Sequence, residues 1–538
     1  MGGLGGQTCA RKRKRTGKRT GTGTARGLGD RVKPIKMASL SIRNPGTGAV
    51  IAEVPAAAPA EVLQAVARAR AAQPAWAALP FAERARALRR LTHRMLADDS
   101  LVDTLVGESG KPRYEAEAIE VFYTCELVRY YTGRAGRRAL RDDLRHPFVF
   151  ANKRARVIYH ARGVVGVIGP WNWPLLNNFA DCVAPLVCGN AVVLKPSEWT
   201  PLTSLRVEAL WRELGLPAGV FQVVAGRGDA GQALCQQADM IFFTGSQKVG
   251  RQIARDAGER LIPVVLELGG KSPMLVLADA DLPRAAHAAV WSGFAHSGQV
   301  CVRTERVLVE ESVAERFIAL CAAEIAQLRQ GPSAPAGGDP TAVAFDVGAM
   351  TFAPQVDTAR AQIADAVARG ARVVTGGAER HDLGGRFFQP TLIADATPDM
   401  AVMREETFGP VLPVMRVPDA ETALRIANDS PMGLSGSVWS RDEGRARALA
   451  RRLESGSVCV NDVLVNYFCV EAPLGGVKGS GLGLRHGPEG LRQFCRLETV
   501  VEDHPLLGFL SPFVGRQLMF PYRSRVLRLP RWLMRRIY

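Results

Sequence analysis

The stretch MIFFTGSQKVGRQIARDAGERLIPVVLELGG, residues 240–270, places two short runs of β-branched and aromatic residues on either side of a helical pattern. A strand, a helix and a second strand in this order predict a parallel sheet with helices on its faces. Such sheets bind ligands at the carboxyl ends of their strands. The stretch therefore predicts a nucleotide-binding lobe.

The same alternation extends in both directions from this stretch. On its amino-terminal side, AVVLKP (191–196) and VFQVVAG (220–226) are predicted strands separated by a predicted helix at 201–214. On its carboxyl-terminal side, further predicted strands lie among helices and indicate a second α/β lobe; they are SPMLVL (272–277), RVLVE (306–310), ARVVTGG (371–377) and GSVWS (436–440). The fold class predicted is α/β, with a Rossmann-like parallel sheet and a second α/β domain.

The residues ahead of the first sheet divide into two kinds of pattern. Residues 59–110 have apolar positions at helical spacing with arginines between them, which predicts two or three amphipathic helices. FVFANKRARVIYHARGVVGVIGPW (148–171) alternates as strands do. Its first half is polar enough to predict an exposed β-hairpin or arm.

The net charge of +17 is concentrated in two tails. The first 36 residues contain eleven Lys or Arg and one Asp, residues 516–538 contain seven Arg and no acid, and the body between is neutral overall. This distribution disfavours nucleic-acid binding by the body. The first 36 residues are predicted to be disordered, and three interpretations stay open: a basic arm for nucleic acid, a targeting segment, or an extension ahead of a start at Met37.

The ten cysteines are scattered, without a C-x-x-C pair or a Cys/His cluster of zinc spacing. We therefore predict a reducing compartment, no disulfide framework and no metal site. No run of 18 apolar residues occurs, which predicts a soluble, cytoplasmic protein. Cys301 stands in HSGQVCVRTE (296–305), where small, polar neighbours suit an accessible thiol better than a packed one.

A series of motifs follows in a fixed order along the chain. They are GPWNWPLL (169–176), KPSE (195–198), FTGS (243–246), ELGGKSP (267–273), GQVC (298–301) and EETFGPV (405–411), followed by PLGGVKGSGLG (473–483). Together they resemble the aldehyde dehydrogenase superfamily, from near Met37 to near Phe494. The resemblance implies a cofactor domain at 37–137 and 164–268, an oligomerisation arm at 138–163 and 494–510, and a catalytic domain at 269–493, between the extension 1–36 and a tail at 511–538.

The resemblance also implies catalytic roles that suit the residue types. Cys301 would add to the aldehyde carbonyl, because a nucleophile must add before the carbon can release hydride. The Asn172 amide and the Cys301 backbone N–H would support the oxyanion. Glu267 would activate water to cleave the thioester, which favours a free acid product over a coenzyme-A ester.

For the cofactor, the resemblance points to NAD, with NADP possible. The stretch from Gly245 to Gly250 is a G-x-x-x-x-G segment at a helix start, where Ser246 can cap and free N–H groups can meet a pyrophosphate. The family holds the adenosine ribose through the equivalents of Lys195 and Glu198, and the nicotinamide ribose near those of Glu406 and Phe408. A carboxylate at Glu198 would repel a 2′-phosphate, so NAD is preferred.

The substrate is less constrained. The motifs place a mostly apolar set along the tunnel: Trp173, Asn177, Ala180, Val300, Val302, Tyr467 and Phe468. Arg303 is interpreted as a solvated or structural charge, so the prediction is a medium-chain aliphatic or aromatic aldehyde. The alternatives are a semialdehyde-specific enzyme, a coenzyme-A-acylating enzyme, or a non-catalytic binding protein on this scaffold.

The family implies a homodimer or homotetramer. The tail at 511–538 is Arg-rich and amphipathic and is expected to be interrupted by Pro530. Two interpretations of it stay open: peripheral contact with an anionic membrane, or packing across a neighbouring subunit.

Overall fold

The first sheet contains six strands in the order β19-β9-β8-β5-β6-β7. The computed structural model describes residues 38–332, 345–520 and 528–537, so the predicted disorder of residues 1–36 lies outside the described residues. Five parallel strands form the body of this sheet: β5 (Val164–Ile168), β6 (Ala191–Lys195), β7 (Phe221–Val223), β8 (Met240–Thr244) and β9 (Val264–Glu267). The sixth, β19 (Gly481–Leu482), pairs antiparallel with β9 and comes from the far end of the chain.

Alternate residues of these strands enter two different cores. Val164 and Ile168 of β5 pack with α1 (Pro59–Ala78) and α9 (Gly228–Gln237), whereas Val165 and Val167 face the opposite layer. That layer contains α2 (Phe81–Leu96), α5 (Phe122–Thr132), α7 (Phe179–Val187) and α8 (Leu202–Glu213). The buried runs are thus explained by helices on both faces, and the predicted α/β class is confirmed.

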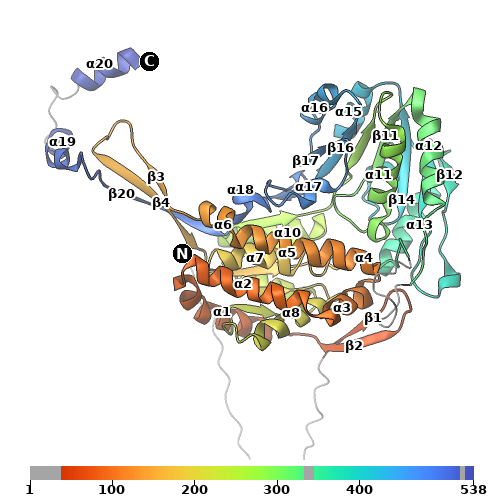
Figure 1. The fold of residues 1–538 in the computed structure, drawn as a ribbon, viewed down its shortest axis with the longest axis horizontal. Coiled ribbons are helices and arrows are strands. Elements are labelled where there is room, and N and C mark those ends of the chain that lie inside the picture. Colours follow the sequence, from red (N-terminus) through yellow and green to blue (C-terminus); the bar gives the residue numbers. More distant parts are fainter. Residues whose placement is uncertain (1–37, 333–344, 521–527, 538) are drawn as a thin grey trace, which may run out of the picture. The chain divides into compact units, whose positions relative to one another are not determined.

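A second sheet has seven strands in the order β12-β13-β14-β11-β10-β16-β17. Its strands are β10 (Pro273–Val276), β11 (Arg306–Glu310), β12 (Arg372–Thr375), β13 (Thr391–Ala394), β14 (Val411–Val417), β16 (Ser435–Trp439) and β17 (Ser457–Val460). Only β12 runs antiparallel to its neighbour. Around the sheet lie α11 (Leu282–Phe294), α12 (Glu311–Ile325), α13 (Ala353–Ala368), α14 (Ala401–Arg404), α15 (Ala420–Asn428) and α16 (Glu443–Ala450) (Figure 1).

The third sheet is antiparallel and has the order β20-β4-β3. β4 (Lys153–Ala161) pairs along its whole length with β20 (Cys495–Asp503), and β3 (Asp143–Arg145) adds a short edge. Figure 1 shows these strands as a ribbon with α19 (Ser511–Leu518) following β20 at the end where β3 and β4 are joined. The predicted hairpin is present, and its partner strand comes from the carboxyl-terminal side.

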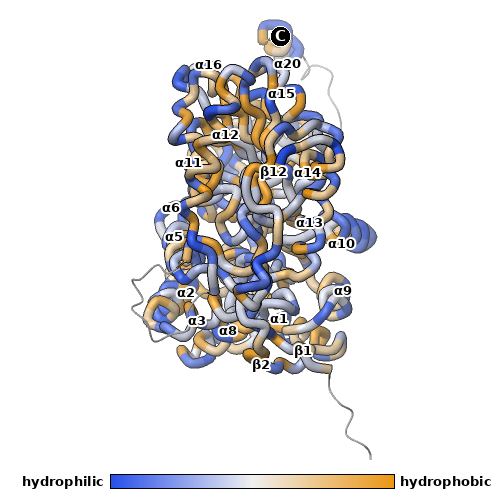
Figure 2. The backbone as a smooth tube through the Cα atoms, turned by 90° about the vertical axis from the view of Figure 1, so that its right-hand side faces the viewer, coloured by the Kyte–Doolittle hydropathy of each residue, from blue (hydrophilic) through white to orange (hydrophobic). Residues whose placement is uncertain are grey.

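The remaining elements connect these sheets. They are β1 (Ser39–Arg43), β2 (Val50–Pro55), α3 (Asp99–Ser109), α4 (Arg113–Glu115), the π-helical turn η1 (Ala116–Val121), α6 (Arg134–Ala139), α10 (Gln247–Arg260), η2 (Ala295–Gly298), η3 (His381–Leu383), β15 (Met432–Gly433), α17 (Val465–Phe468), β18 (Val477–Lys478), α18 (Gly487–Arg492) and η4 (Gly508–Leu510). The two or three helices predicted over residues 59–110 are three, α1, α2 and α3, and Gly110 ends the last of them with φ +75°. Figure 2 shows α10 in the colour of hydrophilic residues, in keeping with its exposed outer face.

The structure corrects one expectation about the tail. Helix α20 begins at Arg528 and ends at Ile537, so Pro530 falls in its first turn and does not interrupt it. Proline is tolerated there because the first N–H groups of a helix have no partner within it. Among the described helices, none has the length and apolar character needed to cross a bilayer.

Candidate active site

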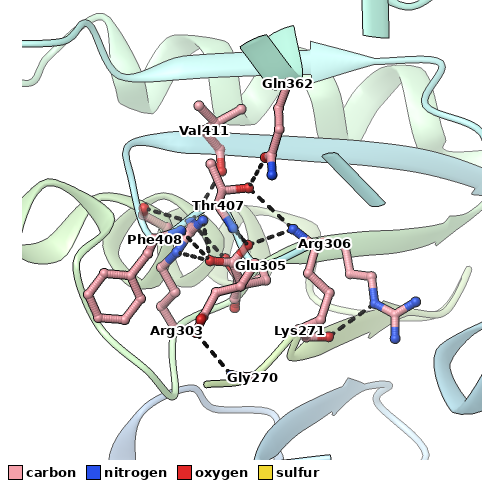
Figure 3. Close-up of polar contacts among 12 residues, drawn as sticks. Gly270, Lys271, Arg303, Glu305, Arg306, Gln362, Thr407, Phe408 and Val411 are labelled. Atoms are coloured by element: carbon pink, nitrogen blue, oxygen red, sulfur yellow. Dashed lines mark hydrogen bonds and ion pairs between the residues drawn. The ribbon is translucent and has the colours of Figure 1, made fainter. Parts of the chain in front are cut away.

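Three loops meet beside the carboxyl end of β9, and a single buried carboxylate joins them. Glu305 is fully buried and forms ion pairs with Lys271 (2.6 Å) and Arg303 (2.6 Å). It also accepts hydrogen bonds from the backbone N–H groups of Thr407 (3.1 Å) and Phe408 (3.1 Å). Figure 3 shows these groups converging on Glu305 from the loops that follow Glu267, Cys301 and Glu405.

The network continues outward through its cations. The Arg303 guanidinium donates to the carbonyl oxygens of Val411 (3.1 Å) and Gly293 (3.2 Å). Lys271 Nζ donates to Thr407 Oγ1 (3.3 Å), which in turn donates to Gln362 (2.7 Å). Burial raises the pKa of Glu305, but Arg303 and Lys271 outweigh it and hold that pKa below its usual range. Of the two interpretations of Arg303, the structural charge is the one found, because its side chain has no exposure to solvent.

The turn before Cys301 has an unusual backbone. His296 and Ser297 have φ values of 46° and 55°, and Gly298 has 72°. A Cβ at residue 298 would overlap the carbonyl oxygen of Gly409, so only glycine fits. The strained turn is held by Glu115, which accepts from the His296 backbone N–H at 2.8 Å, and by Ser297, which donates to the Gly348 carbonyl at 2.7 Å.

Asn172 lies on a loop whose backbone is hydrogen-bonded to the buried charges of Lys111 and Glu120. Its backbone carbonyl accepts from Lys111 Nζ (2.9 Å), and Lys111 pairs with Glu120 of the π-helical turn. Glu120 accepts from the backbone N–H groups of Leu175 (2.8 Å) and Leu176 (3.1 Å). The Asn172 amide donates to the Gln299 carbonyl at 2.9 Å, two residues before Cys301. The amide is therefore fixed next to the cysteine loop with one of its two hydrogens engaged.

Cys301 opens into an apolar cavity. The cavity is lined by Ile119, Trp173, Leu176, Asn177, Ala295, Val300, Cys301, Val302, Leu464, Tyr467 and Phe468. Six of the seven residues expected along a tunnel are in this lining, and Ala180 instead lies buried within α7. The Tyr467 hydroxyl donates a hydrogen bond to Asn177 Oδ1 at 2.6 Å. The lining contains no charged side chain.

Arg485 lies behind the cavity wall and was not predicted. It is 5 % exposed and donates to Tyr467 Oη (2.8 Å), Asn177 Oδ1 (3.0 Å) and Thr244 Oγ1 (2.9 Å). Its ion-pair partners are Asp181 (3.4 Å) and Glu267 (3.7 Å). A buried cation thus sits between two buried carboxylates, Asp181 of α7 and Glu267 at the end of β9.

Burial and the charges around Arg485 together shift the pKa values of two side chains. Burial raises the pKa of Glu267 to about 7; Arg485 acts to lower it and Asp181 to raise it. Burial raises the pKa of the Cys301 thiol to about 12; Arg485 opposes the rise, and Glu267 and Glu406 add to it. The resting cysteine is therefore a thiol near neutral pH, and the Glu267 carboxyl is only partly ionised there.

A second group of predicted residues lies at the carboxyl ends of β6 and β8. Lys195 Nζ is 3.6 Å from Glu198, and burial lowers the lysine pKa, with Glu198 opposing the fall. Ser246 caps α10 by accepting from the Val249 backbone N–H at 3.4 Å. A Cβ at Gly250 would overlap Leu268, so the helix packs closely on the sheet. A lysine–carboxylate pair suits ribose hydroxyls, and a capped helix start suits a pyrophosphate.

Glu406 lies against the loop that follows β9. Its carboxylate accepts from the Gly270 backbone N–H at 3.0 Å and occupies the space that a Cβ at Gly269 would need. Burial raises its pKa to about 7, with Glu305 adding to the rise. Phe408 has φ 50° and packs edge-on against Trp171, with ring centres 5.4 Å apart. The two residues expected at the nicotinamide ribose thus contact neighbouring loops: Glu406 contacts the loop after β9, and Phe408 contacts the loop after Cys301.

Sequence reasoning missed the residues that hold the site from outside it. Arg485 lies two residues beyond the last quoted motif, Asp181 one residue beyond Ala180, and Glu305 at the end of the cysteine motif. Their signal was a charged residue beside a motif of small and apolar ones. In the described residues, nine cysteines are free and no group of His, Cys, Asp or Glu is arranged to hold a metal ion.

A model of the aldehyde dehydrogenase family matches residues 33–500. The chain belongs to the aldehyde dehydrogenase family. A solved aldehyde dehydrogenase from Mycobacterium tuberculosis, complexed with NAD+, is 35% identical with a TM-score of 0.81, and the match covers 87% of this chain and 95% of that one. An NAD-dependent aldehyde dehydrogenase from Sinorhizobium meliloti is 34% identical with a TM-score of 0.80, covering 87% and 91%.

Two curated relatives differ in the activity that their names describe. A 4,4'-diapolycopene aldehyde oxidase from Methylomonas sp is 39% identical over 503 residues, 92% of this chain and 88% of the relative. A putative succinate-semialdehyde dehydrogenase [NADP(+)] 2 from Mycobacterium bovis is 36% identical over 494 residues, 90% and 93%. This aldehyde dehydrogenase is thus an NAD(P)-dependent oxidoreductase that converts an aldehyde to an acid and has a catalytic cysteine.

We expect the substitution Glu305→Gln to lower the free energy of unfolding of this aldehyde dehydrogenase by about 3–5 kcal/mol, because it leaves two buried cations without their carboxylate. Urea unfolding followed by tryptophan fluorescence measures the change. The control is Glu443→Gln, which removes the exposed pair with Arg447 and should change stability by less than about 1 kcal/mol. Equal effects of the two substitutions would show that Glu305 does not hold the loops together.

Proposed function

We propose that this aldehyde dehydrogenase oxidises apolar aldehydes, medium-chain aliphatic or aromatic, and prefers NAD to NADP. The observation that carries the proposal is the cavity at Cys301, whose lining is apolar and contains no lysine or arginine. A substrate with a terminal carboxylate would lose its hydration there without gaining a cation. Arg485 does not supply one, because its guanidinium is engaged behind the wall by Asp181, Glu267, Tyr467 and Asn177.

In the proposed first step, the Cys301 sulfur adds to the aldehyde carbon. The S–C bond forms as the carbonyl π bond breaks, and the thiol proton passes to water. The negative charge moves to the carbonyl oxygen. The free hydrogen of the Asn172 amide and the Cys301 backbone N–H are the donors proposed for that oxygen.

The residues proposed for the cofactor fit a dinucleotide. Lys195 and Glu198 offer a donor and an acceptor for the adenosine ribose, and the start of α10 offers free N–H groups to the pyrophosphate. Glu406 is placed for the second ribose by its bond to Gly270. When bound, the nicotinamide supplies the acceptor for the hydride. The Glu198 carboxylate would repel a 2′-phosphate, which supports NAD as the preferred form.

In the proposed last step, water attacks the thioester on Cys301. Glu267 takes the water proton as the new C–O bond forms, and the C–S bond then breaks to release the acid. The sulfur leaves as a thiolate and takes the proton from Glu267, which restores both groups. A base with a pKa of about 7 suits this role, because it is partly ionised at neutral pH and still basic enough to accept a proton. Arg485 and Asp181 are proposed as positioning residues, because they act through Glu267.

The names of the relatives bear on the choice of substrate. The succinate-semialdehyde name belongs to a relative whose substrate carries a carboxylate, and the charge-free cavity of this chain does not favour such a substrate. The diapolycopene aldehyde name of the 39% identical relative agrees better with an apolar cavity. We also propose that the residues divide into the cofactor, catalytic and arm domains expected from the sequence, and that the β3-β4-β20 sheet joins two or four copies.

A series of straight-chain aldehydes tests the substrate class directly. We expect kcat/KM to rise about fourfold for each added methylene while the cavity has room, from about 0.8 kcal/mol per buried CH2. Each aldehyde should exceed its analogue of equal length with a terminal carboxylate by at least about tenfold. NADH absorbance gives the rates. Parallel assays with NADP test the cofactor preference, and assays with coenzyme A test whether the product is the free acid. Higher kcat/KM for the carboxylate series would overturn the proposal.

Opposite shifts of the pH profile test the roles of Arg485 and Asp181. Arg485 lowers the pKa of Glu267 and Asp181 raises it, so Arg485→Met should move the acid limb of kcat to higher pH and Asp181→Asn to lower pH. Arg485→Lys keeps the positive charge, so its acid limb should stay close to that of the unchanged enzyme. A merely structural role predicts lower activity in all three variants with the limb unmoved, and that result would contradict the assignment.

A further inference from the structure

The free end of the three-stranded sheet carries a concentration of exposed apolar side chains, which we call the tip patch. It combines the loop between β3 and β4 with the segment after β20, and its members are Phe148, Val149, Phe150, Leu506, Leu507, Phe509, Leu510 and Phe513. Phe148 and Val149 are each 79% exposed, Leu506 77% and Phe509 75%. Large apolar side chains clustered in this way on a surface mark an interaction site.

Hydrogen bonds fix the two parts of the tip patch together. The Asn152 carbonyl accepts from the His504 backbone N–H at 2.8 Å, and the Asn152 amide donates to Ser511 Oγ at 2.7 Å. The rings of His146 and His504 have centres 5.7 Å apart. Figure 1 shows the β3–β4 loop and α19 at the same end of the sheet. The patch is therefore one built surface of two chain segments.

The chain that follows β20 carries side-chain charges of a single sign. Residues 504–538 contain seven arginines and neither Asp nor Glu. The acids that precede this segment are already paired, Asp503 with Lys153 at 2.6 Å and Glu502 with Arg154 at 2.7 Å. The end of the sheet and the tail are thus apolar and cationic, and lack a free acid among the described residues.

Helix α20 repeats this combination. At 100° per residue, Arg528, Arg531, Arg535 and Arg536 fall on one face, and Leu533, Met534 and Ile537 fall toward the other. The Arg536 guanidinium lies 4.6 Å from the centre of the Trp532 ring. Trp532, Met534 and Ile537 are each about half-exposed, at 51%, 54% and 51%. A short helix of this kind lies in the plane of a bilayer surface with its arginines toward anionic headgroups.

We propose that the tip patch and α20 form a docking surface for an anionic lipid bilayer. Charge complementarity selects this occupant, because lipid phosphates and carboxylates supply the acid that the segment lacks. A contact between the tip patches and tails of two copies is disfavoured, because it would bring identical arginine-rich segments together without acids between them, whereas the strands β3, β4 and β20 stay available to a second copy. No described helix is suited to cross the bilayer, so the contact is with its surface.

Flotation of the full-length protein with vesicles tests the proposal. Phosphatidylcholine vesicles containing phosphatidylserine should carry the protein upward, and vesicles of phosphatidylcholine alone should carry at least about tenfold less. Replacing Arg528, Arg531, Arg535 and Arg536 together by Gln should remove the preference for the anionic vesicles. The matched control makes the same change at four exposed arginines of the body, Arg86, Arg316, Arg441 and Arg451, and should float as the unchanged protein does.

The tip patch is tested separately from the arginines. The triple variant Phe148→Ser, Val149→Ser, Phe509→Ser should lose at least about tenfold in vesicle binding. The control changes three exposed apolar residues elsewhere to Ser: Leu96, Leu261 and Val367. Both triple variants should keep the rate of NADH formation with a short water-soluble aldehyde, so failure of docking and failure of the proposed function are distinguishable.

Three results would overturn the proposal. Equal flotation with neutral and anionic vesicles would remove the role of charge. Unchanged binding by the tip variant would remove the role of the patch. A tip variant that loses oligomer mass in analytical ultracentrifugation, with no flotation of the parent protein, would show that a second copy covers the patch instead.

Discussion

Glu305 is the group on which the geometry of the site depends. It is a buried carboxylate that pairs with Lys271 from the loop after Glu267 and with Arg303 from the loop after Cys301. It also accepts from the backbone of the loop that carries Glu406 and Phe408. Three segments that are far apart in sequence are therefore fixed relative to one another by one side chain. Two buried cations lower the pKa of Glu305, so it is ionised at neutral pH and keeps its ion pairs with Lys271 and Arg303.

A second buried charge, Arg485, acts on the chemistry. It is surrounded by Asp181, Glu267, Tyr467 and Asn177, and its position behind the cavity wall keeps the wall apolar on the substrate side. The same cation favours the ionised forms of Glu267 and Cys301. In the proposed function, the site thus separates two tasks that a cation in the cavity could not combine: apolar contact with the substrate, and electrostatic support for Glu267 and Cys301.

The sequence was informative wherever the signal was local. Runs such as MIFFT and AVVLK predicted the buried strands, and the order of the motifs predicted the family and the residues around Cys301. The long-range pairs could not be predicted, because Arg485 and Asp181 are 304 positions apart and no local pattern links them. Arg303 shows the same limit. Its burial is intelligible only once the carbonyl oxygens of Gly293 and Val411 are brought to it by the fold.

We propose that Cys301 carries the acyl group of an apolar aldehyde until Glu267 promotes its hydrolysis. The most direct measurement is peptide mass spectrometry of a Glu267→Gln variant quenched after mixing with NAD and a medium-chain aldehyde. We expect an added acyl group on the peptide that contains Cys301, and none in a variant that also carries Cys301→Ala. Absence of the adduct, or its presence on the exposed Cys469 instead, would contradict the account.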